Sequence, residues 1–150
     1  MFNFDLHTPT RILFGKGAIE NLRAQIPADA RVLITYGGGS VKKTGVLDQV
    51  LAALKGLDVL EFGGIEPNPS YETLMNAVKI AREQKVTFLL AVGGGSVLDG
   101  TKFIAAAAHY DESIDPWEIL ETYGSHVTSA IPMGSVLTLP ATGSESNKGA

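Results

Sequence analysis

Two short glycine-rich runs contain the residue types that could bind a phosphate group. The runs are Gly37-Gly38-Gly39-Ser40 and Gly93-Gly94-Gly95-Ser96, and each follows a short apolar segment. Glycine allows backbone N–H groups to approach an anion because it has no Cβ, and the dipole at the start of a helix favours negative charge there. Phosphate is therefore the ligand that this pattern favours.

The two runs are more informative together than singly. Glycine is also common at strand-to-helix turns for reasons of backbone geometry alone, so either run by itself is equally compatible with a structural role. Their occurrence at equivalent places in two successive units favours phosphate binding. Two phosphate contacts indicate a dinucleotide.

The standard phosphate-binding and catalytic fingerprints are absent. The third glycine of G-x-G-x-x-G is replaced by Lys42 in the first run and by Leu98 in the second, and nothing matches GxxxxGK[ST] or GxSxG. These absences disfavour P-loop nucleoside triphosphatases and α/β-hydrolases. His7, His109 and His126 are isolated in the sequence, so no complete metal site is expected in this chain.

The segments that would position the two runs alternate between strand and helix patterns. Strands are predicted over 2–7, 31–36, 59–62, 86–92 and 135–139, of which the first is expected at a sheet edge. Helical segments are predicted over 19–26, 46–54, 70–81 and 97–108, with another that starts at 115–118. This order predicts an α/β fold, a Rossmann-like open parallel sheet with flanking helices, whose ligands bind at the carboxyl ends of the strands.

Several side chains have expected structural roles. Ser96 with Asp99 fits a capping box, a role compatible with cofactor contact, and Ser70 and Asp115 are expected helix caps. The residues expected in the core near the last helix are Trp117, Ile119 and Leu120. The residues expected on a solvated helix face are Glu72, Lys79, Arg82 and Glu83.

The composition limits the class of protein. The 150 residues are 45% hydrophobic and 19% charged and include no cysteine, which is typical of one packed domain without disulfides. A net charge of -4 with scattered Lys and Arg disfavours a nucleic-acid partner, and the apolar runs are too short to span a membrane, so a cytoplasmic protein is expected. The residues before Ala150 form neither a cap nor a tail, so we expect the chain to be the first part of a longer protein.

Four motifs resemble those of the iron-containing (group III) alcohol dehydrogenases. The segment from Gly93 to Lys102 is similar to the family signature GGGSxxDxxK. The supporting matches are TPTRILFGKG at 8–17, EPNP at 66–69 and TLPATGSE at 138–145. The resemblance extends over the whole chain, and in detail it is to the family's bacterial NADPH-dependent aldehyde reductases.

The resemblance implies a dehydroquinate synthase-like N-terminal domain, residues 1–150, that binds a dinucleotide, and a C-terminal helical domain that carries a metal. It implies that the pyrophosphate and nicotinamide side of the cofactor lies along Gly94, Gly95, Ser96 and Asp99. The adenosine and ribose regions would be lined by Asn68, Thr138, Leu139 and Thr142, and the adenosine 2′ position would be surrounded by Gly37, Gly38, Gly39 and Ser40. The family's metal ligands, one Asp and three His, would lie beyond Ala150, so this chain would contain no complete catalytic centre and would be inactive alone.

The implied reaction is hydride transfer between NADP(H) and a small aldehyde or alcohol, with a divalent metal, iron or zinc, polarising the substrate oxygen. Two alternatives stay open. One is a relative of dehydroquinate synthase or of the polyol-phosphate dehydrogenases, which share the fold and a GGGS-type loop and would have a basic pocket for a substrate phosphate. The other is a non-catalytic nucleotide-binding module, which downstream metal ligands would exclude.

Two further expectations concern the complete enzyme. The first glycine run offers no carboxylate that would repel a 2′-phosphate, and Ser40, Lys42 or Lys43 would bind one, so NADP(H) should be preferred to NAD(H). Gly39→Asp should reduce that preference, provided that Gly39 does not need a positive φ. The strand over 2–7 should pair between two subunits, so a homodimer is expected.

Overall fold

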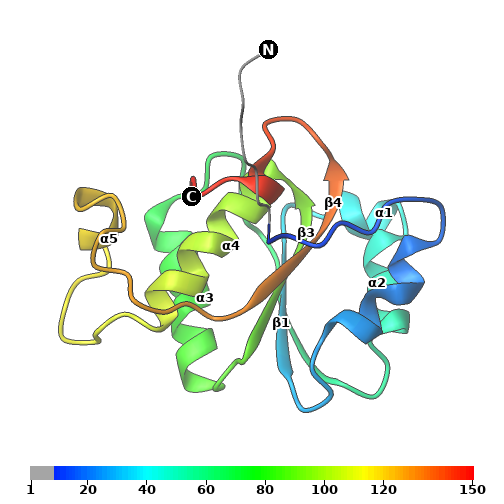
Figure 1. Ribbon diagram of the computed structural model, residues 1–150, viewed down its shortest axis with the longest axis horizontal. Helices are drawn as coiled ribbons and strands as arrows, with labels where there is room; N and C mark the ends of the chain where they lie inside the picture. Colours follow the sequence, from blue (N-terminus) through cyan, green and yellow to red (C-terminus); the bar gives the residue numbers. More distant parts are fainter. Residues whose placement is uncertain (1–8) are drawn as a thin grey trace, which may run out of the picture.

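A four-stranded parallel sheet forms the centre of the computed structural model, which describes residues 9–150 (Figure 1). The strands are β1 (Arg31–Tyr36), β2 (Asp58–Phe62), β3 (Phe88–Gly94) and β4 (Met133–Leu139), in the spatial order β2-β1-β3-β4. The predicted α/β class and open parallel sheet are confirmed. The strand predicted over 2–7 lies outside the described residues.

Helices cover both faces of the sheet, as Figure 1 shows. One face is covered by the 3-10 helix η1 (Ala18–Gln25), α1 (Ser40–Lys43) and α2 (Val46–Ala53). The other is covered by α3 (Tyr71–Glu83) and α4 (Gly95–Ala108), with α5 (Glu118–Glu121) farther out. A second 3-10 helix, η2 (Ser144–Ser146), follows β4 and contacts α4.

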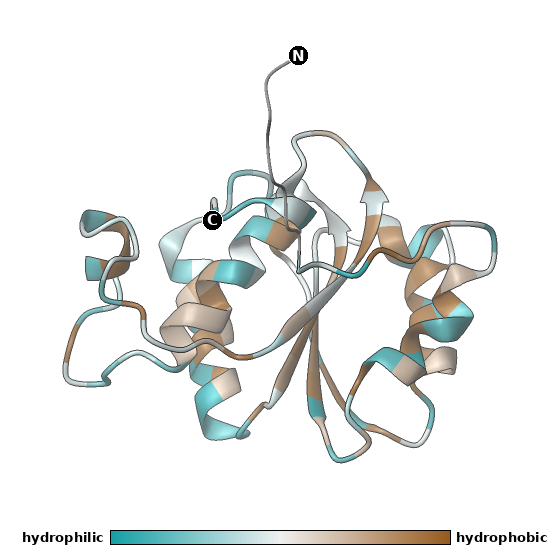
Figure 2. Cartoon of the chain, in the orientation of Figure 1, coloured by the Kyte–Doolittle hydropathy of each residue, from teal (hydrophilic) through white to brown (hydrophobic). Residues whose placement is uncertain are grey.

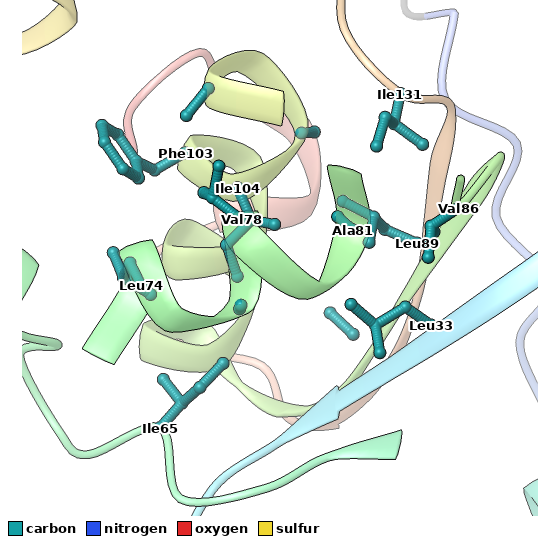
Figure 3. Close-up of a cluster of buried hydrophobic side chains, with 14 of the residues drawn as sticks. Leu33, Ile65, Leu74, Val78, Ala81, Val86, Leu89, Phe103, Ile104 and Ile131 are labelled. Carbon is teal, nitrogen blue, oxygen red and sulfur yellow. The ribbon is translucent and has the colours of Figure 1, made fainter. Parts of the chain in front are cut away.

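The central strands are apolar because both of their faces are covered. Successive side chains of a strand point to opposite faces. Leu33 and Leu89 therefore pack with α3 and α4, in the cluster drawn in Figure 3, whereas Ile34 and Leu90 pack on the side of α2. Brown apolar positions accordingly face inward on both sides of the sheet in Figure 2.

A side-chain cap explains where α3 begins. The Ser70 side chain accepts a hydrogen bond from the Thr73 N–H at 3.2 Å, so the predicted N-cap of α3 is confirmed. The predicted cap at Asp115 is wrong, because α5 has Trp117 as its N-cap and no side-chain cap; Asp115 Oδ1 instead accepts from the Trp117 N–H at 3.0 Å in the turn before the helix. Within residues 9–150, no helix is both long enough and apolar enough to cross a membrane.

Two further structural expectations are wrong. Trp117 is 45% exposed and Leu120 is 42% exposed, and only Ile119 is buried, because a four-residue helix turns just one side chain toward the core. Arg82 does not belong to a solvated face. Its Nη2 donates to the carbonyls of Ala107 at 2.7 Å and Tyr110 at 3.3 Å, and its Nε donates to the carbonyl of Ala108 at 3.4 Å, so it binds carbonyl groups at and just beyond the end of α4.

Candidate dinucleotide-binding site

The two glycine runs lie next to each other at the carboxyl edge of the sheet. β1 and β3 are neighbouring parallel strands, and the first run follows β1 while the second continues β3. From β1 the chain proceeds to β2 on one side, and from β3 it proceeds to β4 on the other. The runs therefore flank the point at which the strand order reverses, which is the usual ligand position in such sheets.

The other predicted site residues reach the same edge from the two outer strands. Asn68 lies in the loop after β2 with a positive φ of 51°, and Thr138 and Leu139 are the last residues of β4. Leu139 is paired with Gly94 in the sheet, and its side chain is 69% exposed. Thr142 follows β4, and its hydroxyl lies 3.1 Å from that of Ser144.

Four glycines of the two runs are required by the fold itself. A Cβ on Gly37 would lie 3.0 Å from the carbonyl oxygen of Ile65, and one on Gly93 would lie 3.0 Å from Val97 Cγ2. A Cβ on Gly95 would lie 3.2 Å from Ser144 Oγ, so this glycine lets the loop after β4 approach α4. Gly39 has a φ of +112°, a conformation that side chains rarely adopt.

The remaining two glycines, Gly38 and Gly94, are required by neither backbone conformation nor packing. Neither has a left-handed φ, and a Cβ added to either would meet no atom within 4 Å. Gly38 belongs to the first run and Gly94 immediately precedes α4. Each therefore leaves open space above the backbone at the edge where ligands of this fold bind.

Gly39→Asp is not a clean test of cofactor choice, because Gly39 has a positive φ of +112°. Gly39→Asp would strain the backbone whatever its charge does to a phosphate. Gly38 is one residue earlier and has the open space without the special conformation. An acidic side chain is therefore better introduced at position 38.

Basic and acidic side chains both lie near the first glycine run. The Lys42 ammonium lies 5.1 Å from the centre of the Tyr36 ring, and Lys42 and Lys43 are both exposed on α1. Glu61 Oε1 accepts a hydrogen bond from the Tyr36 hydroxyl at 3.4 Å and brings a carboxylate to the end of β2. Glu61 has no predicted role from the sequence, although an acidic residue at this strand end is a familiar ribose ligand.

The capping box predicted for Ser96 and Asp99 is wrong. Helix α4 already begins at Gly95, with Gly94 as its N-cap and no side-chain cap, so Ser96 lies inside the first turn. The Asp99 carboxylate instead accepts a hydrogen bond from Lys102 Nζ at 3.2 Å. Asp99 is therefore free of the capping role, one turn away from the second glycine run.

Comparison with known proteins assigns this arrangement to a family. The family described as iron-containing alcohol dehydrogenase matches residues 9–150. The chain belongs to that family. The resemblance inferred from the four motifs is thereby confirmed, and the dehydroquinate synthase alternative gains no support.

Relatives of this iron-containing alcohol dehydrogenase chain include enzymes named for either cofactor. It is 85% identical over its whole length to "NADPH-dependent aldehyde reductase YqhD" of Escherichia coli (strain K12), of which it covers 39%. It is 49% identical to "NADP-dependent alcohol dehydrogenase 3" of Entamoeba histolytica, over 98% of this chain and 39% of that protein. It is also 49% identical to "Probable NADH-dependent butanol dehydrogenase 1" of Bacillus subtilis, over 99% of this chain and 38% of that protein. Overall identity therefore does not determine the cofactor.

Solved structures show the same fold. The crystal structure of YqhD from E. coli K-12 has a TM-score of 0.94 and 86% identity, and the match covers 97% of this chain and 37% of that one. NADH-dependent butanol dehydrogenase A from Thermotoga maritima has a TM-score of 0.85 and 42% identity, over 93% of this chain and 35% of that one. The chain thus spans less than two fifths of these relatives.

Two residues of the family motifs, Lys102 and Glu145, have contacts that the sequence did not predict. Lys102 also donates to Asn147 Oδ1 at 2.9 Å and to the Gly149 carbonyl at 2.7 Å, so it ties the last described segment to α4. Glu145 Oε2 is buried without a hydrogen-bond partner among residues 9–150. The motifs that contain Lys102 and Glu145 were visible, but a sequence does not show which groups a side chain meets.

Histidines and carboxylates do not form a metal centre in the described part of this chain. No group of three or more such side chains lies close enough to hold an ion in residues 9–150. His109 and His126 line a cavity of about 310 Å³, beyond the end of α4 that is opposite to the glycine run. His126 Nδ1 lies 3.2 Å from Glu118 Oε1 there.

Proposed function

We propose that this chain is the NADP(H)-binding domain of a metal-dependent alcohol dehydrogenase that interconverts small aldehydes and alcohols. The observation that carries the proposal is the open space at Gly38 and Gly94. Glycine loses more conformational freedom on folding than any other residue, so a position that does not need it structurally has another reason for it. Close approach of a ligand to the backbone is such a reason.

The cofactor would lie across the edge between β1 and β3. Its pyrophosphate would bind at Gly94, Gly95 and Ser96, where the 14-residue helix α4 directs free N–H groups and its positive dipole end outward. Its adenosine 2′-phosphate would lie at the first run, with Ser40 and the two lysines of α1 in reach. The loop residues Asn68, Thr138, Leu139 and Thr142 would line the adenosine and ribose.

The residues of this chain would bind and orient the cofactor, and its nicotinamide would supply the hydride. Asp99 lies one turn beyond the pyrophosphate loop, with its carboxylate held by Lys102. That contact fixes the direction of the carboxylate toward one side of α4. Asp99 would therefore position the nicotinamide end of the cofactor.

The rest of the enzyme is proposed to follow this chain. One Asp and three His from that part would bind the divalent metal, iron or zinc, which fits the family description. The substrate would be bound between the two parts, and the strand over 2–7 would pair two subunits into a homodimer. A cytoplasmic enzyme without nucleic-acid or membrane partners is consistent with the negative net charge of -4.

A direct test is Gly94→Ala in the full-length enzyme, with NADPH binding measured by calorimetry. The added methyl meets no protein atom, so the melting temperature should not fall. NADPH affinity should fall by about tenfold or more, because every tenfold step corresponds to about 1.4 kcal/mol, the scale of one blocked hydrogen bond.

The matched control is Gly134→Ala on β4, where the new Cβ makes an ordinary contact with Phe88 at 3.5 Å. It should leave NADPH affinity unchanged. Wild-type affinity for NADPH in Gly94→Ala would contradict the proposed site. Binding of NADPH without turnover in the metal-loaded full-length protein would favour the non-catalytic module.

A further inference from the structure

Two threonine hydroxyls are hydrogen-bonded to each other in the apolar core, between β1 and α4. Thr35 Oγ1 and Thr101 Oγ1 lie 2.7 Å apart, and both residues are fully buried. Thr101 Oγ1 also donates to the Val97 carbonyl at 2.6 Å, one turn earlier in α4. Because that bond uses the single hydroxyl proton of Thr101, Thr35 is the donor of the shared bond.

Packing alone does not account for these hydroxyls. Valine has nearly the same shape as threonine, and burying a hydroxyl group costs free energy unless it is hydrogen-bonded. Within residues 9–150, Thr35, Thr101 and Ser144 are the buried polar residues. A hydrogen bond is directional, so the threonine pair favours one placement of α4 on β1 more strictly than apolar contacts would.

Val97 connects the threonine pair to both glycine runs. A Cβ on Gly37 would lie 3.7 Å from Val97 Cγ2, and a Cβ on Gly93 would lie 3.0 Å from the same atom. A side chain on the first glycine of either run would therefore meet the same methyl group. The carbonyl of that same residue accepts the Thr101 hydrogen bond.

We infer that Thr35 and Thr101 are positioning residues that set the separation of the two glycine runs. Thr35 is two residues before Gly37, and Thr101 is five residues after Ser96. A displacement of α4 along β1 moves Gly95 and Ser96, the first residues of α4, relative to Gly38 and Ser40. A ligand that contacts both runs loses affinity on such a displacement, whereas a ligand that contacts only the first run does not.

This inference rests on the proposed function. The test therefore compares a ligand that would contact both glycine runs with a ligand that would contact only the first of them. The ligands are NADP⁺ and adenosine 2′-monophosphate, titrated by calorimetry into the full-length enzyme and into Thr101→Val. NADP⁺ affinity should fall about tenfold, the effect of roughly one hydrogen bond, and adenosine 2′-monophosphate affinity should change less than twofold. Thr101→Ser keeps the hydroxyl and should restore the wild-type ratio of the two affinities.

A destabilised control separates positioning from general loss of stability. Val78→Ala removes buried volume from α3, away from both runs, and should lower the melting temperature while leaving the ratio of affinities unchanged. An unchanged ratio in Thr101→Val despite a lower melting temperature would overturn the inference and leave the proposed function intact. A wild-type enzyme that binds neither NADP⁺ nor NAD⁺ would overturn both.

Discussion

Lys102 holds Asp99 by a hydrogen bond of 3.2 Å while also binding the Asn147 side chain and the Gly149 carbonyl. Of the two side chains, Lys102 is 17% exposed and Asp99 is 36% exposed. The carboxylate thus remains partly accessible to solvent. The lysine keeps two other acceptors if the carboxylate is lost.

Asp99→Ala is therefore expected to affect turnover more than folding. A partly exposed ion pair contributes about 0–1 kcal/mol, so the melting temperature of the full-length enzyme should change little. Turnover should fall by at least tenfold, because a carboxylate at the nicotinamide end would orient the cofactor. The idea fails if activity declines only in proportion to the folded fraction.

Gly38→Asp should reduce or reverse a preference for NADP(H) over NAD(H). The new carboxylate would stand in open space beside the 2′ position, where it repels a phosphate and accepts hydrogen bonds from ribose hydroxyls. A charged hydrogen bond is worth about 1.5–3 kcal/mol, so the preference should shift by one to two orders of magnitude. Gly38→Asn is the matched control, with the same size and no charge. Equal shifts in both variants, measured by calorimetry, would rule out a charge effect.

Arg82→Leu should destabilise the domain because the carbonyls of Ala108 and Tyr110 lose the donor that Arg82 provides, and Ala107 O loses one of its donors. Arg82 Nη2 donates to Ala107 O at 2.7 Å, and hydrogen bonds to charged groups contribute about 1.5–3 kcal/mol. Lys79→Leu is the control on the same helix, since its only ion pair in the described chain is an exposed contact of 3.9 Å with Glu83. Urea denaturation of the two variants should differ clearly, and equal midpoints would show that the Arg82 contacts contribute nothing.

Ionisation of Glu66 should make the free energy of unfolding depend on pH in acidic solution. The Ser70 N–H donates to its carboxylate at 2.8 Å, and this bond, with others from Ser70 and Thr73, lowers the pKa of Glu66 from 4.5 to about 2. Because the folded pKa is the lower one, the contribution is complete above pH 4.5 and is lost as the pH falls toward 2. Glu66→Gln should flatten the stability profile in that window. NMR titration giving Glu66 an ordinary pKa would contradict the prediction.

Residues 1–150 alone should have no alcohol dehydrogenase activity. The part of the chain that the structure describes contains no group of side chains that could hold a metal ion. Hydride transfer to an aldehyde in this family would need such an ion to polarise the substrate oxygen. Metal-dependent oxidation of NADPH by the purified fragment would refute this expectation.

The fold class and the place of the glycine runs could be predicted from the sequence. Continuous apolar runs such as Leu89 to Val92 identify strands buried on both faces, because both sides of a parallel sheet are covered by helices. The spacing of apolar residues in a strand or a helix is a local property, so it can be read from the sequence. The GGGSxxDxxK motif likewise carried the family resemblance, since its residue types and spacing are themselves the signal.

The packing of the strands and helices shows which glycines the fold needs and which leave space for a ligand. The four consecutive letters Gly37-Gly38-Gly39-Ser40 do not show that Gly39 has a positive φ while Gly38 faces open space. In the same way, Asp99 could be a cap or a partner of Lys102 until the start of α4 was located at Gly95. These roles depend on atoms that are distant in the chain, such as Thr35 and Thr101, and contacts of that kind are fixed only when the strands and helices pack.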